Sequence, residues 1–371
     1  MFEKFFGFIL FSFLIFQYSF AKEPLRFRKD GTFQIMQLTD LHYGGYFPED
    51  VQSDLAQQTY FETEGENTDF VVFTGDILAV FCQIPIVAWQ RAVYFTNFYQ
   101  KNYAVTFGNH DYTEFYLLDK LITMDMEYEY SYSQKGPENI HGVSNYYLEV
   151  LGSDSNETQL ILYFFDTGDS DCEGVLGWGC VFHNQIEWYK NISNYLKEKN
   201  NRTIPALAFF HIPLPEYLDV WNNNICYGFK EETTCCWSQN TGLYQTFLEQ
   251  GDVYGVFVGH DHKNDFIGNY NGIYLAYGRK SGFGCYEPEL PTVQGTRIIK
   301  VQENSREIES WIRNKNGIKE IQKIHYPDEK DTQNYCLEHN PNPIPSSNGS
   351  KIHISSFFLF SFSFFFFSFF L

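Results

Sequence analysis

Five short apolar runs in this chain each end at side chains that can bind a metal ion or move a proton. The runs are FQIMQL, DFVVF, YAVTF, ALAFF and VYGVFV. They are short and rich in β-branched and aromatic residues, which is typical of buried strands. The polar residues that follow them are, in chain order, Asp40, His42, Asp76, Asn109, His110, His211, His260 and His262. Five of the 10 histidines stand at these positions, which a random distribution does not explain.

Strand-like runs alternate with helical patterns along the chain, which predicts an α/β fold. Strands are expected over residues 33–38, 69–73, 103–107, 159–165, 206–210, 253–258 and 272–277. Helices are expected over residues 48–62, 85–100, 184–199 and 241–250, two of them opening with proline. Ligands of α/β sheets bind where the carboxyl ends of the strands open into a crevice. The five polar groups are therefore expected to meet at one site.

The polar groups supply a mixed set of oxygen and nitrogen ligands. The expected metal ligands are Asp40, His42, Asp76, Asn109, His211, His260 and His262. Carboxylate, amide and imidazole together suit Zn, Fe or Mn rather than Ca or Mg. The set is too large for one tetrahedral metal and about right for two metals that share a carboxylate. Asp76 is the natural bridge, because it lies between the other two N-terminal motifs.

The order D-x-H, G-D, G-N-H-D, H and G-H-x-H resembles the calcineurin-like metallophosphoesterases, over roughly residues 33–301. The segments FFHIPLPEY, FFDTG, GHDHKNDF and YGRKSGFG are similar to the purple-acid-phosphatase-like branch that keeps D-x-H. This resemblance implies a four-layer α/β/β/α sandwich of two mixed sheets flanked by helices. True purple acid phosphatases have a metal-bound tyrosine where this chain has Ala79, and they lack the histidine found at His42. A tyrosinate-to-iron colour is therefore not expected.

The resemblance also assigns roles to individual residues. One metal would be held by Asp40, His42, Asp76 and His262, and the other by Asp76, Asn109, His211 and His260. His110 would stay unligated beside the substrate and act as the catalytic general acid. A carboxylate would orient it. Asp111 is one candidate for this task, although it is equally placed to cap the following turn.

The net charge of the chain limits the class of substrate. The chain has 26 Lys and Arg against 46 Asp and Glu, a net charge of -20, which argues against nucleic acid as a partner. Two divalent cations would outweigh the charges of Asp40 and Asp76 and create a positive pocket for a phosphorylated substrate. Arg279 and Lys280 are open to two interpretations, a phosphate contact or a solvated loop.

We expect phosphate ester hydrolysis in which a hydroxide bridging two metals attacks phosphorus, without a covalent enzyme intermediate. A phosphomonoester is the preferred substrate class. Phosphodiester cleavage on the same metal centre is the first alternative, and a catalytically silent surface binding protein is the second.

The two ends of the chain carry targeting patterns. Residues 1–21 are predicted to be a secretory signal peptide, because an apolar stretch ends at Ser19, Phe20 and Ala21. Small residues over 346–350, a spacer and the apolar tail over 357–371 match a glycosylphosphatidylinositol signal, with residues 349–371 removed. Asn348 is the expected attachment residue, and Ser346 or Ser347 would satisfy the same rule. A short tail anchor is the alternative. A metallophosphoesterase domain would then cover residues 22–302, and a C-terminal extension and stalk residues 303–348.

Export to the cell surface, with a lipid anchor in place of a membrane span, predicts disulfides and glycans. Among the eight cysteines, we expect a bond between Cys172 and Cys180 across the loop CEGVLGWGC. A cysteine zinc site is disfavoured because the chain has no C-x-x-C pair. Asn156, Asn191 and Asn201 each begin an N-x-S/T tripeptide and are predicted glycan acceptors on the surface.

Overall fold

The computed structural model describes residues 22–113, 117–286, 292–327 and 330–331. The expected signal peptide, residues 328–329 and 332–348 of the extension and stalk, and the attachment signal with Asn348 lie outside the described residues. The described residues fold into two large sheets and a two-stranded hairpin.

The smaller sheet has five strands. In spatial order they are β15 (Ile308–Asn314), β14 (Gly295–Gln302), β2 (Thr32–Leu38), β3 (Phe70–Thr74) and β4 (Tyr103–Thr106). The pairs β2–β3 and β3–β4 are parallel, whereas β14 pairs antiparallel with both β2 and β15. The helices on its outer side are α1 (Phe47–Glu64), α2 (Pro85–Ala92), α3 (Tyr94–Phe98) and α4 (Leu118–Met126).

The larger sheet has nine strands. In spatial order they are β1 (Leu25–Arg26), β5 (Tyr146–Leu151), β6 (Thr158–Phe164), β9 (Ala206–Phe209), β11 (Val253–Val258), β13 (Ile273–Tyr277), β12 (Ile267–Tyr270), β10 (Cys226–Tyr227) and β16 (Ile324–His325). The central strands β6, β9, β11 and β13 are parallel. The helices of this half are α5 (His183–Asn200), α6 (Glu216–Asn223) and α7 (Leu243–Gln250).

A two-stranded hairpin and two 3-10 turns complete the fold. The strands β7 (Ser170–Cys172) and β8 (Val175–Trp178) form the two-stranded hairpin, and two 3-10 turns cover Gly65–Asn67 and Asn109–Asp111. The expected disulfide between Cys172 and Cys180 is present and closes the hairpin loop. That prediction is confirmed.

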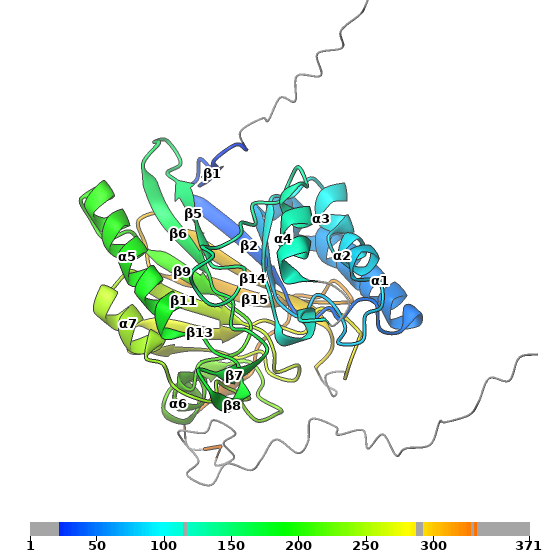
Figure 1. The fold of residues 1–371 in the computed structure, drawn as a ribbon. Helices are drawn as coiled ribbons and strands as arrows, with labels where there is room; N and C mark the ends of the chain where they lie inside the picture. The colour runs from blue at the N-terminus through cyan, green and yellow to red at the C-terminus, as the bar shows by residue number, and fades with distance from the viewer. Residues whose placement is uncertain (1–21, 114–116, 287–291, 328–329, 332–371) are drawn as a thin grey trace, which may run out of the picture.

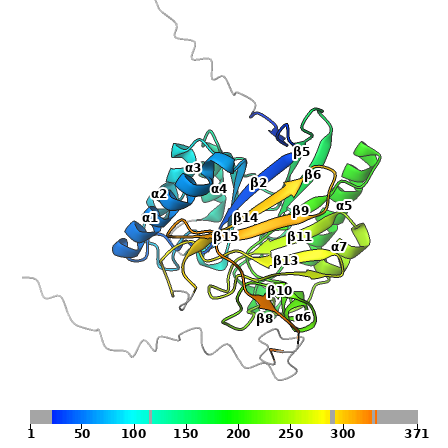
Figure 2. The same cartoon turned by 180° about the vertical axis from the view of Figure 1, so that it is seen from behind.

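The core is arranged in three apolar clusters, because the central strands bury both of their faces. In β2, Phe33 and Ile35 point to the other sheet, while Met36 and Leu38 point to α1 and its neighbours. The strands β9 and β11 divide their side chains in the same way between the inter-sheet cluster and the cluster under α5 and α7. Strands buried on both faces appear in the sequence as continuous apolar runs. The result is the expected four-layer α/β/β/α sandwich (Figures 1 and 2).

The sequence predicted the central elements and missed some peripheral ones. All seven expected strands and four expected helices are present, although the expected helix over 85–100 is divided into α2 and α3 at Val93. The domain boundary expected after residue 302 lies inside the fold. Residues 308–314 form the edge strand β15 of the smaller sheet, and residues 324–325 form the edge strand β16 of the larger one.

Within the described residues, no helix is both long enough and apolar enough to cross a bilayer.

Candidate metal centre

The loops after five parallel strands bring the predicted residues to one place. Those after β2, β3 and β4 belong to the smaller sheet, and those after β9 and β11 to the larger one. The structure therefore gathers Asp40, His42, Asp76, Asn109, His110, His211, His260 and His262 where the carboxyl ends of the two sheets meet. The seven expected ligand residues have 8% or less of their surface exposed.

A first group of ligand atoms is compact. One atom each from Asp40, His42, Asp76 and His262 can be chosen so that all four lie within 4.8 Å of one another. The Nε2 atoms of His42 and His262 are 3.0 Å apart, and His262 Nε2 lies 3.4 Å from Asp40 Oδ1. These four residues are the set that the family resemblance implied for one metal. We call them the first ligand group.

The remaining predicted ligands, His211, Asn109 and His260, take part in two close contacts. His211 Nε2 lies 3.3 Å from Asp76 Oδ2. His260 Nδ1 lies 3.0 Å from Asn109 Oδ1. Asp76, Asn109, His211 and His260 are called the second ligand group below.

In two histidines, the hydrogen bond at Nδ1 leaves the lone pair of Nε2 available to a cation. Nδ1 of His211 faces the carbonyl oxygen of Thr74 at 2.8 Å, and Nδ1 of His262 faces that of Tyr286 at 3.0 Å. A carbonyl only accepts, so in the neutral ring Nδ1 carries the proton and Nε2 is free to bind a cation. His211 Nε2 is buried and has no hydrogen-bond partner among the described residues. The residues present thus fit a metal ion.

The charges of the site also favour a cation. Burial opposes ionisation of Asp40, but His262 and His211 hold the pKa of Asp40 below its usual range. Burial opposes ionisation of Asp76 as well, and His211 and His110 hold its pKa far below its usual range. Burial alone would lower the pKa of His211, but Asp76 and Asp40 raise it to about 9. Burial lowers the pKa of His42 and that of His260, so both rings stay neutral and able to ligate.

Four of the gathered residues have strained backbones. The φ angles are 54° at Asp40, 53° at His42, 50° at Asp76 and 76° at His260. Residues with a Cβ atom rarely adopt this left-handed region, and such strain concentrates at functional sites.

The glycines of the motifs allow the strand ends to approach one another. A Cβ atom on Gly108 would lie 2.3 Å from Asp76 Oδ1, and one on Gly75 would lie 2.5 Å from the backbone nitrogen of Gly108. A Cβ atom on Gly259 would lie 2.0 Å from Thr39 Oγ1. Only glycine therefore fits before Asp76, Asn109 and His260.

His110 lies at the rim of the cluster. Its side chain is 23% exposed, and its Nε2 atom is 3.9 Å from Asp76 Oδ2. Its backbone N–H donates to Asp76 Oδ1 at 2.8 Å. Among the described residues, no hydrogen bond joins the Asp111 carboxylate to the His110 ring, whose Nδ1 atom has no partner. Its carboxylate instead accepts hydrogen bonds from the backbone N–H groups of Gly108 and Leu78, at 2.9 and 2.8 Å, so it caps its own turn rather than the following one.

The cationic side chains of Arg279 and Lys280 near the site are buried, so the interpretation of their segment as a solvated loop is wrong. Arg279 is 1% exposed and donates to Asp265 and Glu320. Lys280 is also 1% exposed, and its Nζ donates to the carbonyl oxygen of Asp40 at 2.9 Å. Arg279 is engaged in ion pairs, whereas Lys280 supports the loop of the first ligand group. No sequence motif indicated that contact.

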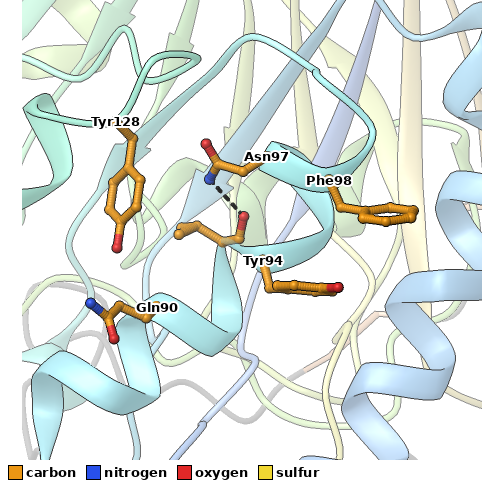
Figure 3. A pocket seen from close by; sticks show the side chains of 6 residues that line it. Gln90, Tyr94, Asn97, Phe98 and Tyr128 are labelled. Carbon is orange, nitrogen blue, oxygen red and sulfur yellow. Dashed lines mark hydrogen bonds between the residues drawn. The ribbon is translucent and has the colours of Figure 1, made fainter.

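Two other features lie apart from the cluster. The predicted glycan acceptors Asn156, Asn191 and Asn201 are all exposed. A surface groove over α2 and α3 (Figure 3) contains none of the predicted ligands and is lined by Gln90, Val93, Tyr94, Asn97, Phe98 and Tyr128.

Comparison with known proteins identifies the family. The model of the calcineurin-like phosphoesterase family matches residues 33–264. The chain is 31% identical to "Probable inactive purple acid phosphatase 29" of Arabidopsis thaliana, over 78% of this chain and 82% of that protein. It is 29% identical to "Phosphatase DCR2" of Saccharomyces cerevisiae, over 79% of this chain and 55% of that protein.

Among solved structures, the chain is similar to a dimetal phosphatase from Danio rerio, with 13% identity, coverage of 76% of this chain and 98% of that chain, and a TM-score of 0.46. A purple acid phosphatase from yellow lupin seeds has 12% identity, coverage of 81% and 55%, and a TM-score of 0.47. From the family match and the similarity to the curated relatives, the chain belongs to the calcineurin-like phosphoesterase family, in its purple-acid-phosphatase-like branch.

Proposed function

We propose that this protein is a phosphohydrolase that cleaves phosphate monoesters at a dinuclear metal centre. The observation that carries the proposal is the convergence of seven potential ligands from both sheets, with His110 beside them. The names of both relatives described above contain the word phosphatase, which supports the choice of a monoester.

The two ligand groups would hold one metal each, with Asp76 shared between them. When bound, two divalent cations supply a water of lowered pKa and stabilise negative charge on the phosphate oxygens. Zn, Fe and Mn all suit this mixture of carboxylate, amide and imidazole ligands. Lys280 keeps Asp40 in place through its carbonyl oxygen.

His110 is the proposed catalytic acid. Its backbone N–H is fixed on Asp76 Oδ1, so the position of the residue follows that of the proposed bridging carboxylate. Its ring is partly exposed, whereas the predicted ligands are buried, so it can reach a substrate that approaches from solvent. The protonated ring would donate to the oxygen of the departing alcohol. A general acid of this kind contributes roughly 10² to 10⁴-fold in rate.

A silent binding protein is the second candidate, because three Arabidopsis relatives are named "Probable inactive". In this chain no position of either ligand group has been replaced by a residue unable to bind metal, which favours activity.

The deciding experiment uses the full chain produced in a eukaryotic secretory host. Metal analysis should find two ions per chain, and p-nitrophenyl phosphate should be hydrolysed faster than bis(p-nitrophenyl) phosphate. The opposite substrate preference would indicate a phosphodiesterase. Two bound ions without hydrolysis of either ester, at any pH tested, would indicate the silent alternative.

We also propose export and attachment to the cell surface through a lipid at Asn348. The exposed positions of Asn156, Asn191 and Asn201 and the disulfide between Cys172 and Cys180 support this location. A phospholipase specific for phosphatidylinositol should release the protein from intact cells. Deletion of residues 357–371 should send it into the medium, and retention of that variant at the surface would contradict the lipid anchor.

A further inference from the structure

Cys285 lies against the first ligand group, although no motif indicated it. Atoms of three residues, the Sγ atom of Cys285 and a ring nitrogen from each of His42 and His262, lie within 4.8 Å of one another. Among the described residues, Cys285 is one of the cysteines outside a disulfide, and it is exposed. Thiolate and imidazole are ligands that zinc prefers.

The backbone around Cys285 lies close to the loop that carries His42. A Cβ atom on Gly282 would lie 2.2 Å from the carbonyl oxygen of Leu41, and one on Gly284 would lie 2.4 Å from that of His42. The segment after β13 therefore packs directly on the loop after β2. Cys285 itself has a φ of 68°, which is the same left-handed strain that Asp40, His42 and Asp76 show.

The two histidines beside Cys285 point independently to a ligand. The side chain of His42 is fully buried, and its Nδ1 atom has no hydrogen-bond partner among the described residues. Its Nε2 atom faces Nε2 of His262 at 3.0 Å. Because Nδ1 of His262 faces the carbonyl oxygen of Tyr286, the Nε2 atom of the neutral His262 ring carries a lone pair. A cation beside the two Nε2 atoms would accept a lone pair from each of them.

We propose that Cys285 is an additional ligand of the metal held by the first ligand group, on its solvent side. The inference rests on the proposed function, because it requires a metal at that position. On binding, the S–H bond breaks, the proton passes to solvent, and the sulfur donates an electron pair to the metal without any oxidation. A metal lies about 2.3 Å from sulfur and about 2.0 Å from imidazole nitrogen, so ligand atoms can be up to about 4.3 Å apart. Cys285 Sγ already lies within 4.8 Å of both histidine nitrogens, and its exposed side chain would move toward the Asp40 and Asp76 carboxylates on binding.

X-ray absorption at the zinc edge tests the proposal on the full-length protein loaded with zinc. A scatterer at about 2.3 Å reports sulfur, whereas nitrogen and oxygen ligands lie at about 2.0–2.2 Å. We expect one sulfur per chain in the unmodified protein, complete loss of that signal in Cys285→Ser, and its retention in Cys235→Ser. Cys235 is a suitable control because it is another cysteine outside a disulfide. A persistent sulfur signal in Cys285→Ser would overturn the assignment.

A second measurement needs no variant. Iodoacetamide should modify Cys285 in the metal-free protein, as followed by mass spectrometry of its peptide, and zinc should slow this modification. Equal rates with and without zinc, at two zinc ions bound per chain, would exclude coordination while leaving the proposed function intact. Failure to bind zinc, iron or manganese at all would defeat the proposed function itself, and this inference with it.

Discussion

The two ligand groups share Asp76 but are built differently. The first group is compact and deeply buried: its four residues are 3% exposed or less, and three of them have left-handed backbones. The second group is more open, since Asn109 and His260 are each 8% exposed. A preorganised, dry site binds its ion more tightly than an open one. We therefore expect the first metal to exchange slowly and the second to be the more accessible to solvent and substrate.

Replacing the shared carboxylate of Asp76 should affect both ligand groups alike. Asp76→Asn removes a charge that both metals need, so we expect loss of both ions and a fall in kcat/KM of at least about 10³-fold. Metal analysis and phosphatase assays check this. Asp119→Asn, a change at a half-exposed carboxylate paired with Lys135, is the matched control. If Asp76→Asn kept both ions, Asp76 would not be the bridge.

Replacing the proposed acid should leave both metals in place. His110→Ala is expected to lose roughly 10² to 10⁴-fold in rate on alkyl phosphates, whose leaving groups need a proton. It should lose little on p-nitrophenyl phosphate. His183→Ala, at an exposed histidine paired with Glu173, should change neither rate. Equal losses for good and poor leaving groups would refute the acid role.

Changing one ligand group at a time should distinguish the binding affinities of the two metal ions. Asn109→Ala removes the oxygen 3.0 Å from His260 Nδ1, so it should weaken only one ion, by roughly 10- to 100-fold. His42→Ala should weaken the other. Competition with a chelator should show one tightly held and one weakly held ion in the unmodified protein. Simultaneous release of both ions would remove the proposed distinction.

The smallest effect is expected at the carboxylate that supports the loop. Asp111→Ala leaves the N–H groups of Gly108 and Leu78 without their acceptor, so the protein should lose about 1–3 kcal/mol of unfolding free energy. Urea unfolding measures this change. The dependence of the rate on the leaving group should stay as in the unmodified protein. If that dependence instead resembled that of His110→Ala, Asp111 would act through His110.

The sequence predicted the strands that carry the ligands because these strands are buried on both faces. Their apolar runs are continuous, and the polar residues at their ends therefore stand out. The edge strand β15 was missed for the opposite reason, since IESWIRN is only partly buried and lies in a charged segment. In β14, the fully buried Arg297 interrupts the apolar pattern and donates to the carbonyl oxygen of Tyr277.

Contacts between distant segments account for the rest of what the sequence did not reveal. Lys280 reaches the carbonyl oxygen of Asp40 across 240 positions of the chain. Cys285 reaches His42 only because two glycines allow its segment to pack on another loop. Neither proximity leaves a local pattern. For Asp111 the sequence left two roles open, orientation of His110 and capping of the following turn, whereas the carboxylate caps the turn that Asp111 itself ends.

The ligands come from loops of both sheets, and this has a consequence for thermal behaviour. Each ion would bind ligands from both sheets at once, at the carboxyl ends of their strands, and so would link the two halves of the sandwich. Ligand binding that favours the folded state adds about 4 kcal/mol when the free ion exceeds its dissociation constant a thousandfold. The melting temperature should therefore depend on metal supply, and depletion should loosen the join between the sheets before it loosens either sheet.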